Sequence, residues 1–313
     1  MKLLVTLGAL VFSGFIAATP IHHVVVFGDS LSDNGNFYKD MQSPKFPFYL
    51  GRYSNGPVWV EHLVAAYFPV NPNGHLFNHA YAGAGVDEED FVSGDNLSMT
   101  FKGQVTQYLS QDFDKVPIKD SLFIVWIGAN NYIGNPPEFE RMNTLRAVNE
   151  GIHLNLQRLA DKGAEHILIL NLPDLGMAPF ARKSSAIDAA SISLYSKQHN
   201  RALDETVSYF KQNHPYVDLL YIDMYQLFDD VLKNPAKYDL KNVTSNCYVP
   251  PPPPKKPGLN GMADTIQGDK RVYENDCKHS FFYDEVHPTV VAHKLVAEKI
   301  KILLDAAGFQ ISD

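Results

Sequence analysis

Residues that could carry nucleophilic chemistry lie near both ends of the sequence. Ser30 follows four apolar residues in the stretch VVVFGDSLSDNGN, which runs from Val24 to Asn36. Asp284 and His287 stand three residues apart in FFYDEVHPT, close to the C-terminus. A serine hydroxyl becomes a strong nucleophile when a histidine takes its proton and an acid fixes the tautomer of that histidine. The three residues could form such a triad, although Asp284 could also be a helix cap beside an exposed His287.

Two further positions could supply the hydrogen-bond donors that a developing oxyanion needs. Gly83 lies in NHAYAGAGV, and its amide could approach a substrate oxygen closely because glycine has no side chain. Asn130 lies in IGANNY, and its side-chain amide could donate to the same oxygen. Each signal is weak alone, since glycine and asparagine often follow strands of any kind. The glycines around Gly83 do not have the spacing of a dinucleotide-binding fingerprint.

The elements that must position these residues are indicated by hydrophobic periodicity. Five apolar runs have the length of strands, and their continuous hydrophobicity indicates burial on both faces, as in a parallel sheet. Segments with helical spacing alternate with them, which predicts a three-layer α/β/α sandwich around a five-stranded parallel sheet, with right-handed crossovers. The expected strands are residues 22–27, 76–81, 122–127, 166–172 and 217–223. The expected helices are residues 58–68, 102–112, 142–159, 186–213, 225–233 and 290–307.

The position of Ser30 in this fold suits a binding or catalytic site. Ligands of open α/β sheets bind beyond the carboxyl ends of the strands, and Gly28, Asp29 and Ser30 follow the first expected strand at that end. We expect the polar stretch LSDNGN to begin a helix behind Ser30, whose N-terminus would add positive charge where an oxyanion forms. Near the C-terminus, Pro288 suits the first position of the last helix and would hold His287 at its start.

Composition and charge disfavour some classes of function. The chain has 313 residues, enough for one large domain or two small ones, and a formal net charge of -8 with no basic run. Nucleic-acid binding through phosphate contacts is therefore disfavoured, as is electrostatic docking on an anionic membrane. Zinc binding is also disfavoured, because two cysteines alone do not make a zinc site.

The N-terminus predicts secretion. Residues 1–18 have the layout of a signal peptide, with one lysine, an apolar run and small residues before the expected cleavage after Ala18. A membrane anchor is the alternative, but the apolar run is short for a membrane span. Asn96 and Asn242 begin glycosylation acceptor tripeptides, which fits a secreted protein.

The segment 245–280 breaks the alternation of strands and helices. It carries five consecutive prolines and both cysteines, Cys247 and Cys277, which would close a single disulfide in an oxidising compartment. We interpret the segment as an irregular, proline-rich excursion, either a lid over a site or an ordinary surface loop. The sequence contains no repeat and no linker that separates domains, so residues 19–313 are expected to form one domain and, by default, a monomer.

Taken together, four blocks of the sequence resemble the GDSL lipase/esterase family, the SGNH hydrolases. The blocks are FGDSLSDNGN, NHAYAGAG, IGANNY and DEVHP, in the order of that family. The resemblance implies a flavodoxin-like fold and an acyl-enzyme mechanism without metal or cofactor. Ser30 would be the nucleophile and give a backbone N–H to the oxyanion hole, which Gly83 and Asn130 would complete. His287 would be the general base, oriented by Asp284.

The third block departs from the pattern of the family, which usually reads Gly-x-Asn-Asp. Asn131 stands in the last position of this block. Asparagine keeps the hydrogen-bonding shape of aspartate but lacks its charge. The role that the resemblance gives to Asn130 does not depend on that charge.

The form of the first and last blocks is similar to the branch of the family that contains extracellular lipases and phospholipases. We therefore expect a secreted serine ester hydrolase whose substrate is a small-molecule or lipid ester, in particular a lipid or phospholipid acyl ester. A carbohydrate acetylesterase on the same fold is an alternative. A third possibility is a non-catalytic secreted binding protein, which the presence of the whole set of site residues disfavours.

Overall fold

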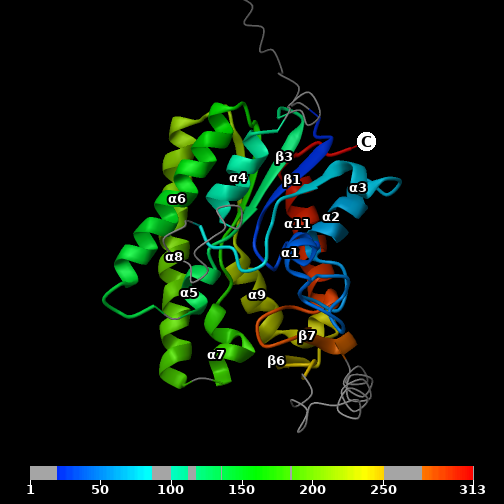
Figure 1. Ribbon diagram of the computed structural model, residues 1–313, viewed down its shortest axis with the longest axis vertical. Helices are drawn as coiled ribbons and strands as arrows, with labels where there is room; N and C mark the ends of the chain where they lie inside the picture. The colour runs from blue at the N-terminus through cyan, green and yellow to red at the C-terminus, as the bar shows by residue number, and fades with distance from the viewer. Residues whose placement is uncertain are drawn as a thin grey trace, which may run out of the picture.

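A five-stranded, all-parallel sheet forms the centre of the protein (Figure 1). The computed structural model describes residues 20–86, 100–111, 118–134, 136–183, 185–249 and 277–312. The strand order is β2-β1-β3-β4-β5, which is the order of flavodoxin-like sheets. The strands are β1 (His23–Gly28), β2 (Leu76–Asn78), β3 (Ser121–Trp126), β4 (His166–Leu170) and β5 (Asp218–Ile222). The predicted parallel sheet is confirmed.

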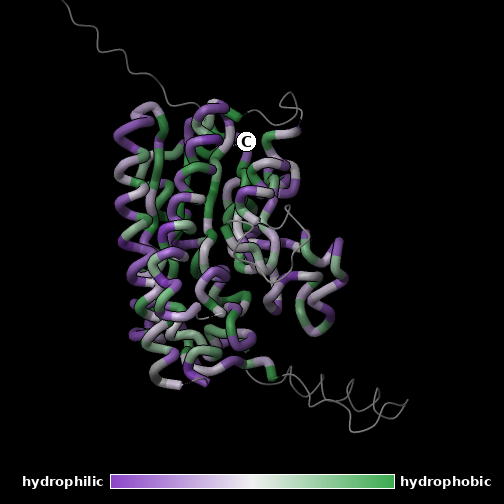
Figure 2. Tube along the Cα trace, turned by 60° about the vertical axis from the view of Figure 1, so that its left-hand side comes forward, coloured by the Kyte–Doolittle hydropathy of each residue, from purple (hydrophilic) through white to green (hydrophobic). Residues whose placement is uncertain are grey.

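Helices cover both faces of this sheet, as the sequence predicts (Figure 1). Side chains of each strand alternate between two cores, so that in β1 Val25 and Phe27 face one core and Val24 and Val26 the other. Burial on both faces explains the continuous apolar runs, which Figure 2 shows as hydrophobic strands between helices of mixed colour. The helices of the first face are α4 (Phe101–Leu109), α6 (Arg141–Asp161) and α8 (Ala186–Asn213), and those of the second are α2 (Trp59–Tyr67), α9 (Met224–Lys233) and α11 (Val290–Ala306).

Several short elements were not indicated by the sequence, because three to six residues carry little periodicity. β6 (Asn242–Asn246) and β7 (Ser280–Phe282) pair in parallel as a separate two-stranded sheet, near the two ends of the segment expected to be irregular. The short helices without such a signal are α3 (Pro72–His75), α5 (Asn130–Ile133) and α7 (Pro179–Lys183), whereas α1 (Asn36–Met41) begins at the end of the stretch LSDNGN, which was expected to begin a helix.

Two expectations about helix starts were wrong. α1 begins at Asn36, so the turn at Ser30 is not itself a helix N-terminus. α11 begins after Thr289, whose hydroxyl caps the helix. Pro288 therefore lies outside α11, where it forms an antiparallel bridge with Phe282 of β7.

Some predictions fall outside the residues that the structure describes. These are the signal peptide at residues 1–18, the glycosylation site at Asn96, and residues 250–276 of the proline-rich excursion. The second expected glycosylation site, Asn242, is partly buried at the start of β6, where its side-chain nitrogen donates to the carbonyl oxygen of Ser245 at 2.9 Å. Within the described ranges, no helix combines the length and the apolar character needed to cross a membrane.

Candidate active site

The carboxyl end of β1 leads directly to Ser30. Gly28, the last residue of β1, donates its N–H to Gln104 Oε1 and accepts from Gln104 Nε2, each at 2.9 Å. A side chain at Gly28 would collide with β3, since its Cβ would lie 2.8 Å from the carbonyl oxygen of Trp126. Glycine therefore lets β1 end close against β3, and the paired hydrogen bonds fix the chain two residues before Ser30.

Asp29 braces the turn that carries Ser30. Its carboxylate accepts the N–H of Leu31 at 3.0 Å, and its carbonyl oxygen accepts those of Ser32 and Asp33 at 3.0 and 2.9 Å. Burial raises the pKa of the Asp29 carboxyl to about 6, against the opposing effect of the Leu31 N–H. The turn thus contains a buried carboxyl group that changes charge in the mildly acidic range.

A second carboxylate joins this turn to the loop that follows β2. Asp33 accepts the N–H groups of residues 35–37 at 2.6 to 3.1 Å, which explains why α1 begins at Asn36. It also accepts the N–H of Ala82 at 2.9 Å, one residue before Gly83. Burial raises the pKa of Asp33, although these four N–H donors favour its charged form. Asp33 therefore holds the serine turn and the Gly83 loop in a fixed relation.

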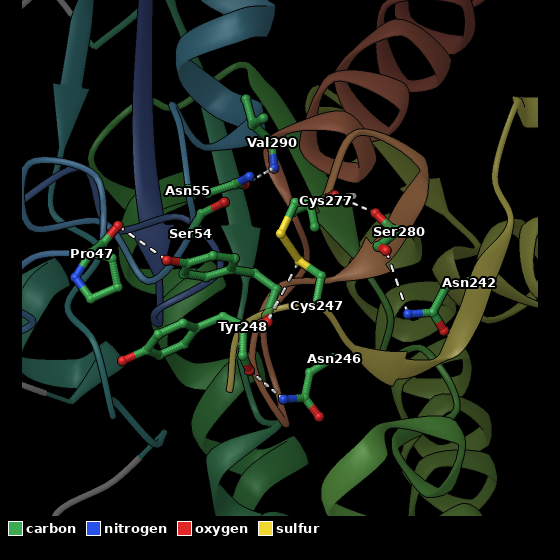
Figure 3. The surroundings of a disulfide bond; sticks show 12 residues. Pro47, Ser54, Asn55, Asn242, Asn246, Cys247, Tyr248, Cys277, Ser280 and Val290 are labelled. Carbon is green, nitrogen blue, oxygen red and sulfur yellow. Dashed lines mark hydrogen bonds between the residues drawn. A yellow bond between two sulfur atoms is a disulfide. The ribbon is translucent and has the colours of Figure 1, made fainter. Parts of the chain in front are cut away.

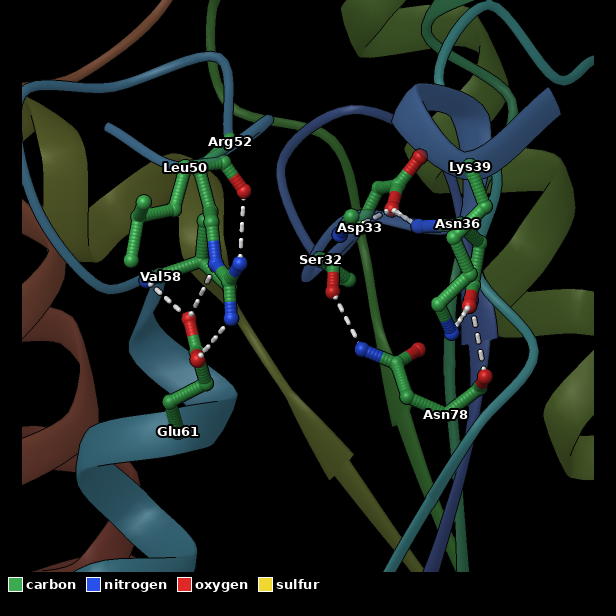
Figure 4. Close-up of polar contacts among 10 residues, drawn as sticks. Ser32, Asp33, Asn36, Lys39, Leu50, Arg52, Val58, Glu61 and Asn78 are labelled. Atoms are coloured by element: carbon green, nitrogen blue, oxygen red, sulfur yellow. Dashed lines mark hydrogen bonds and ion pairs between the residues drawn. The ribbon is translucent and has the colours of Figure 1, made fainter. Parts of the chain in front are cut away.

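Asn78, the last residue of β2, ties the same turn from the other side (Figure 4). Its Nδ2 donates to the carbonyl oxygen of Ser32 at 2.7 Å, and its own carbonyl accepts Nδ2 of Asn36 at 2.8 Å. Its Oδ1 accepts the N–H of Ala80 at 2.9 Å. β2 ends at Asn78 and not at the predicted Tyr81, although the N–H groups of His79 and Tyr81 still donate to the carbonyl oxygens of Val26 and Gly28 in β1 at 2.8 and 3.1 Å.

A turn after β7 brings Asp284 and His287 together. Asp284 Oδ2 and Oδ1 lie 2.7 and 2.9 Å from His287 Nδ1. Oδ1 also accepts the backbone N–H groups of Val286 and His287 at 2.8 and 2.6 Å. Burial alone would raise the pKa of Asp284, but the imidazole of His287 and these hydrogen bonds outweigh it, so the pKa is lowered. One charged carboxylate therefore fixes both the turn and the imidazole.

His287 Nε2 lies 2.8 Å from Ser30 Oγ, although the two residues are 257 positions apart in the sequence. When Nδ1–H faces Asp284, Nε2 is left to accept the serine proton. The alternative of a capping aspartate beside an exposed histidine does not describe this turn, because Thr289 caps α11 and the His287 side chain is only 12% exposed. The arrangement can activate a serine nucleophile.

A loop without a predicted catalytic role supports His287. The ring of Tyr53 lies against the imidazole, with ring centroids 4.9 Å apart. Ser54 Oγ donates to the carbonyl oxygen of Pro288 at 3.0 Å, and Asn55 Oδ1 accepts the first N–H of α11 at 2.8 Å (Figure 3). Neither periodicity nor spacing in the stretch GRYSNG, which contains these residues, indicated this role.

An ion pair fixes the end of this loop at the start of α2 (Figure 4). Arg52 contacts both carboxylate oxygens of Glu61, with N···O distances of 2.6 and 3.2 Å, and both side chains are largely buried. Glu61 also accepts the N–H of Val58 at 2.9 Å, and Arg52 donates to the carbonyl oxygen of Leu50 at 2.7 Å. The bidentate pair therefore connects both ends of the segment from Leu50 to Val58.

Gly83 and Asn130 follow β2 and β3. Gly83 has a φ of +83°, which favours glycine, and a Cβ there would meet no atom within 4 Å. Asn130 Nδ2 donates to the carbonyl oxygen of Ala84 at 2.9 Å and so ties the two loops together. Asn131, which departs from the family pattern, accepts the N–H of Val86 through its side-chain oxygen at 3.2 Å. This contact uses the shape that asparagine shares with aspartate and requires no charge.

An apolar pocket lies beside Ser30. Asn130 lines the same pocket, which places the serine and one expected oxyanion donor around one space. Asp29 and Asp174 also contribute to the lining, which is otherwise mainly hydrophobic. The large apolar side chains of the lining are Leu31, Ile133, Leu175, Phe228, Leu232, Phe282 and Val286. Such a surface favours a hydrocarbon group over a sugar, because it offers few hydrogen-bond partners.

Cys247 and Cys277 are joined by a disulfide, with Cα atoms 5.4 Å apart (Figure 3). Next to it, the ring of Tyr248 stacks on that of Tyr283 with centroids 5.3 Å apart. Tyr283 directly precedes Asp284. The disulfide therefore fastens the chain beside the turn that holds Asp284 and His287.

A flavodoxin-like sheet with a Ser–His–Asp arrangement at its carboxyl edge is the architecture of a serine hydrolase. Comparison with known proteins defines the family. Residues 24–300 match the GDSL-like lipase/acylhydrolase family, so the chain belongs to this family of SGNH hydrolases. Members of the family are carboxylic ester hydrolases, and the family and enzyme class predicted from the sequence are confirmed.

Relatives with similar sequences come from bacteria and plants. A phosphatidylcholine-sterol acyltransferase of Aeromonas hydrophila is 29% identical over 90% of this chain and 90% of its own length. A GDSL esterase/lipase of Arabidopsis thaliana is 25% identical over 89% of this chain and 88% of its own length. Among solved structures, an acetylxylan esterase of Geobacillus stearothermophilus has a TM-score of 0.45 at 14% identity, covering 94% of this chain and 97% of its own.

Proposed function

We propose that the protein is a secreted serine ester hydrolase that cleaves lipid or phospholipid acyl esters through an acyl-enzyme on Ser30. The observation that carries this proposal is the hydrogen-bonded series from Asp284 through His287 to Ser30, with contacts of 2.7 and 2.8 Å, beside an apolar pocket. The series supplies a nucleophile and its base, and the pocket suits an acyl chain.

In the acylation step, Ser30 Oγ bonds to the carbonyl carbon of the ester while His287 Nε2 takes the hydroxyl proton. The carbonyl oxygen becomes an oxyanion, which the N–H groups of Ser30 and Gly83 and the side chain of Asn130 stabilise. The bond to the alcohol oxygen then breaks, and His287 gives its proton to the departing alcohol. Asp284 stays ionised and stabilises the imidazolium that forms between these two transfers.

In the deacylation step, a water molecule attacks the acyl-enzyme, and His287 accepts its proton. The second tetrahedral intermediate uses the same donors as the first. Its collapse breaks the bond to Ser30 Oγ, which recovers its proton from His287 and releases the fatty acid. The same carboxylate therefore supports both halves of the reaction without any change in its own protonation.

The apolar lining of the pocket supports an ester with a hydrocarbon acyl group. Phe228 and Phe282 are buried at its wall, while Leu31, Ile133 and Leu232 are only partly buried and offer apolar surface to a ligand. Each methylene group that leaves water for such a surface contributes about 0.8 kcal/mol. The name of the Aeromonas relative, a phosphatidylcholine-sterol acyltransferase, supports the same substrate class.

Secretion is supported by the N-terminal sequence and by the disulfide between Cys247 and Cys277, since disulfides persist in oxidising compartments. N-terminal sequencing of the protein from the medium of an expressing host tests this part of the proposal. A mature chain that begins at Thr19 supports it, whereas an uncleaved chain retained in the cell contradicts it.

The proposed reaction is tested with nitrophenyl esters from acetate to palmitate and with phosphatidylcholine. The enzymes are the wild type, Ser30→Ala and, as a matched control, Ser110→Ala, which removes an exposed hydroxyl at the end of α4. We expect kcat to fall by a factor of about 10³ or more in Ser30→Ala only, with an optimum above acetate in the wild type. Equal rates for wild type and Ser30→Ala would refute the acyl-enzyme, and an optimum at acetate would favour the carbohydrate acetylesterase.

A further inference from the structure

Four apolar side chains, one at the end of α1 and three in the segment between α1 and α2, have no part in the proposed mechanism. Met41, Phe46, Tyr49 and Leu50 are 54%, 70%, 39% and 67% exposed, and we refer to them as the 41–50 patch. Figure 1 draws this segment as the blue loops below α1, at the end of the molecule that also carries β7. Single exposed apolar residues are common on protein surfaces, whereas a cluster of large ones marks an interaction surface.

The 41–50 patch is held in place by the turn that carries Asp284 and His287, which we call the catalytic turn, and by Tyr283 directly before it. The ring of Phe48 packs edge-on against Tyr283, with centroids 5.3 Å apart, and lies 5.6 Å from the ring of Tyr53. Tyr283 Oη donates to the carbonyl oxygen of Pro47 at 3.1 Å. Because Tyr283 precedes Asp284, the inward-facing residues of the loop rest on the candidate active site and leave their neighbours exposed.

The conformation of Leu50 is unfavourable in two respects. Its φ is +45°, a backbone region that a leucine side chain disfavours, and two thirds of the side chain is exposed. The carbonyl oxygen of Leu50 accepts a hydrogen bond from Arg52 at 2.7 Å, which fixes this conformation. The fold therefore holds an apolar side chain in water at a cost in backbone energy, which is a pattern associated with function.

The charge of the segment suits a lipid surface. Residues 41–51 contain one charged side chain, Lys45, and no acid, although the chain as a whole has a formal net charge of -8. Acidic groups would be repelled by lipid phosphates and would oppose insertion of their neighbours. A loop with exposed phenylalanine, tyrosine and leucine, a single cation and no acid has the composition of an interfacial anchor.

We infer that the 41–50 patch docks on the surface of a phospholipid aggregate and presents acyl esters to Ser30. This inference rests on the proposed function, since an enzyme for lipid esters must meet a substrate that lies in an interface. The same loop carries Tyr53, which contacts His287, so a lipid surface on the patch would lie close to the turn that holds His287. Attachment through apolar side chains makes binding insensitive to salt, in contrast to electrostatic docking.

The test measures sedimentation of the full-length protein with sucrose-loaded phosphatidylcholine vesicles. The Ser30→Ala substitution is present in every protein, so that the vesicles remain intact. Phe46→Ser with Leu50→Ser removes the centre of the patch, and Val70→Ser is the matched control, since Val70 is 88% exposed in the turn between α2 and α3. We expect the double variant to lower the vesicle partition coefficient about tenfold or more, at low and high salt alike, and the control to leave it unchanged.

A second measurement separates docking from catalysis. With Ser30 intact, the same variants are assayed on soluble nitrophenyl butyrate and on phosphatidylcholine vesicles. We expect the double variant to keep its rate on the soluble ester within about twofold and to lose about tenfold or more on vesicles. Vesicle binding that survives the double substitution would overturn the inference, as would an equal loss on both substrates or a dimer held together by the patch. Activity on no ester at all would refute the proposed function itself.

Discussion

The ring of Tyr53 lies against the imidazole of His287, with ring centroids 4.9 Å apart and planes inclined by 35°. The two hydrogen bonds of His287, to Asp284 and to Ser30, lie in the plane of the imidazole, whereas Tyr53 covers one of its faces. The contact therefore restricts rotation of the imidazole out of the line between Asp284 and Ser30.

Tyr53→Ala should lower kcat on a soluble ester about 10- to 100-fold with a small change in KM, because small losses of alignment cost rate more than binding. Tyr53→Phe keeps the ring and removes only the hydroxyl that is hydrogen-bonded to Ser43, so it should retain at least half of the activity. Steady-state kinetics of both variants checks this. A Tyr53→Phe enzyme as slow as Tyr53→Ala would show that the hydroxyl, and not the ring, is important.

The role of Tyr53 shows which parts of the site could be predicted from the sequence. Asp284 and His287 are three residues apart, so their pairing follows from a single turn. Ser30 and His287 are 257 positions apart, so their chemistry made a triad one possibility, and the resemblance to a family was needed to favour it. The contact of Tyr53 with His287 depends on how a loop folds over β7, and neither periodicity nor local spacing reports such a contact.

Parts of the fold were likewise predictable from the sequence, and other parts were not. The strands were predictable because residues such as Val24 and Val25 are buried on opposite faces of one strand, which leaves a continuous apolar run. The position of α1 was not, because Asp33 accepts three successive N–H groups and moves the helix start to Asn36. The start of α1 depends on the Asp33 carboxylate accepting several backbone N–H groups at the same time. The polar stretch LSDNGN does not show in advance which N–H groups these are.

Asp29 should make the protein less stable at neutral pH than at acidic pH. Burial raises its pKa from 3.8 to about 6, so the folded state holds the carboxyl proton more tightly than the unfolded state does. The resulting penalty is absent below about pH 4, grows as the pH rises to about 6 and is complete above that. A shift of this size corresponds to about 3 kcal/mol at most.

Asp29→Asn keeps an oxygen for the N–H of Leu31 and removes the buried charge. Its free energy of unfolding in urea should exceed that of the wild type by about 1–3 kcal/mol at pH 8, and the gain should vanish near pH 4. Asp284→Asn is a control whose effect has the opposite sign. Because the pKa of Asp284 is lowered, its carboxylate stabilises the fold at neutral pH and not in acid, so Asp284→Asn should lower the free energy of unfolding at neutral pH only. A gain for Asp29→Asn that is equal at both pH values would contradict the titration of this carboxyl.

The disulfide between Cys247 and Cys277 should stabilise the catalytic turn as well as the chain. It spans a sequence separation of 30 residues, for which loop-closure entropy gives about 3–4 kcal/mol. Reduction of the wild type should lower the free energy of unfolding by about this amount, and soluble-ester kcat should fall too, since Tyr248 stacks on the residue before Asp284. The double variant Cys247→Ser, Cys277→Ser should match the reduced wild type and should not respond to reductant. A wild type whose unfolding is unchanged by reductant would contradict this role.

Asn130 makes one structural contact and is expected to make one catalytic contact. Its side-chain nitrogen carries two N–H groups, of which one donates to the carbonyl oxygen of Ala84 at 2.9 Å. The other is available for the oxyanion, because Asn130 lines the pocket beside Ser30. Loss of one oxyanion donor lowers kcat by a factor of about 10²–10³. The kcat of Asn130→Ala should therefore fall by that factor, with little change in KM.

A stable tetrahedral adduct distinguishes the catalytic contact of Asn130 from its structural one. Inactivation by a nitrophenyl alkylphosphonate places an oxygen where the oxyanion forms, so the rate of inactivation should fall in parallel with kcat in Asn130→Ala. Leu109→Ala, or another variant that lowers stability away from the site, should leave the inactivation rate unchanged when the enzyme is folded. If the Asn130→Ala enzyme were slow on esters but inactivated at the wild-type rate, the side-chain amide of Asn130 would contribute nothing to the tetrahedral state, and its place in the oxyanion hole would be refuted.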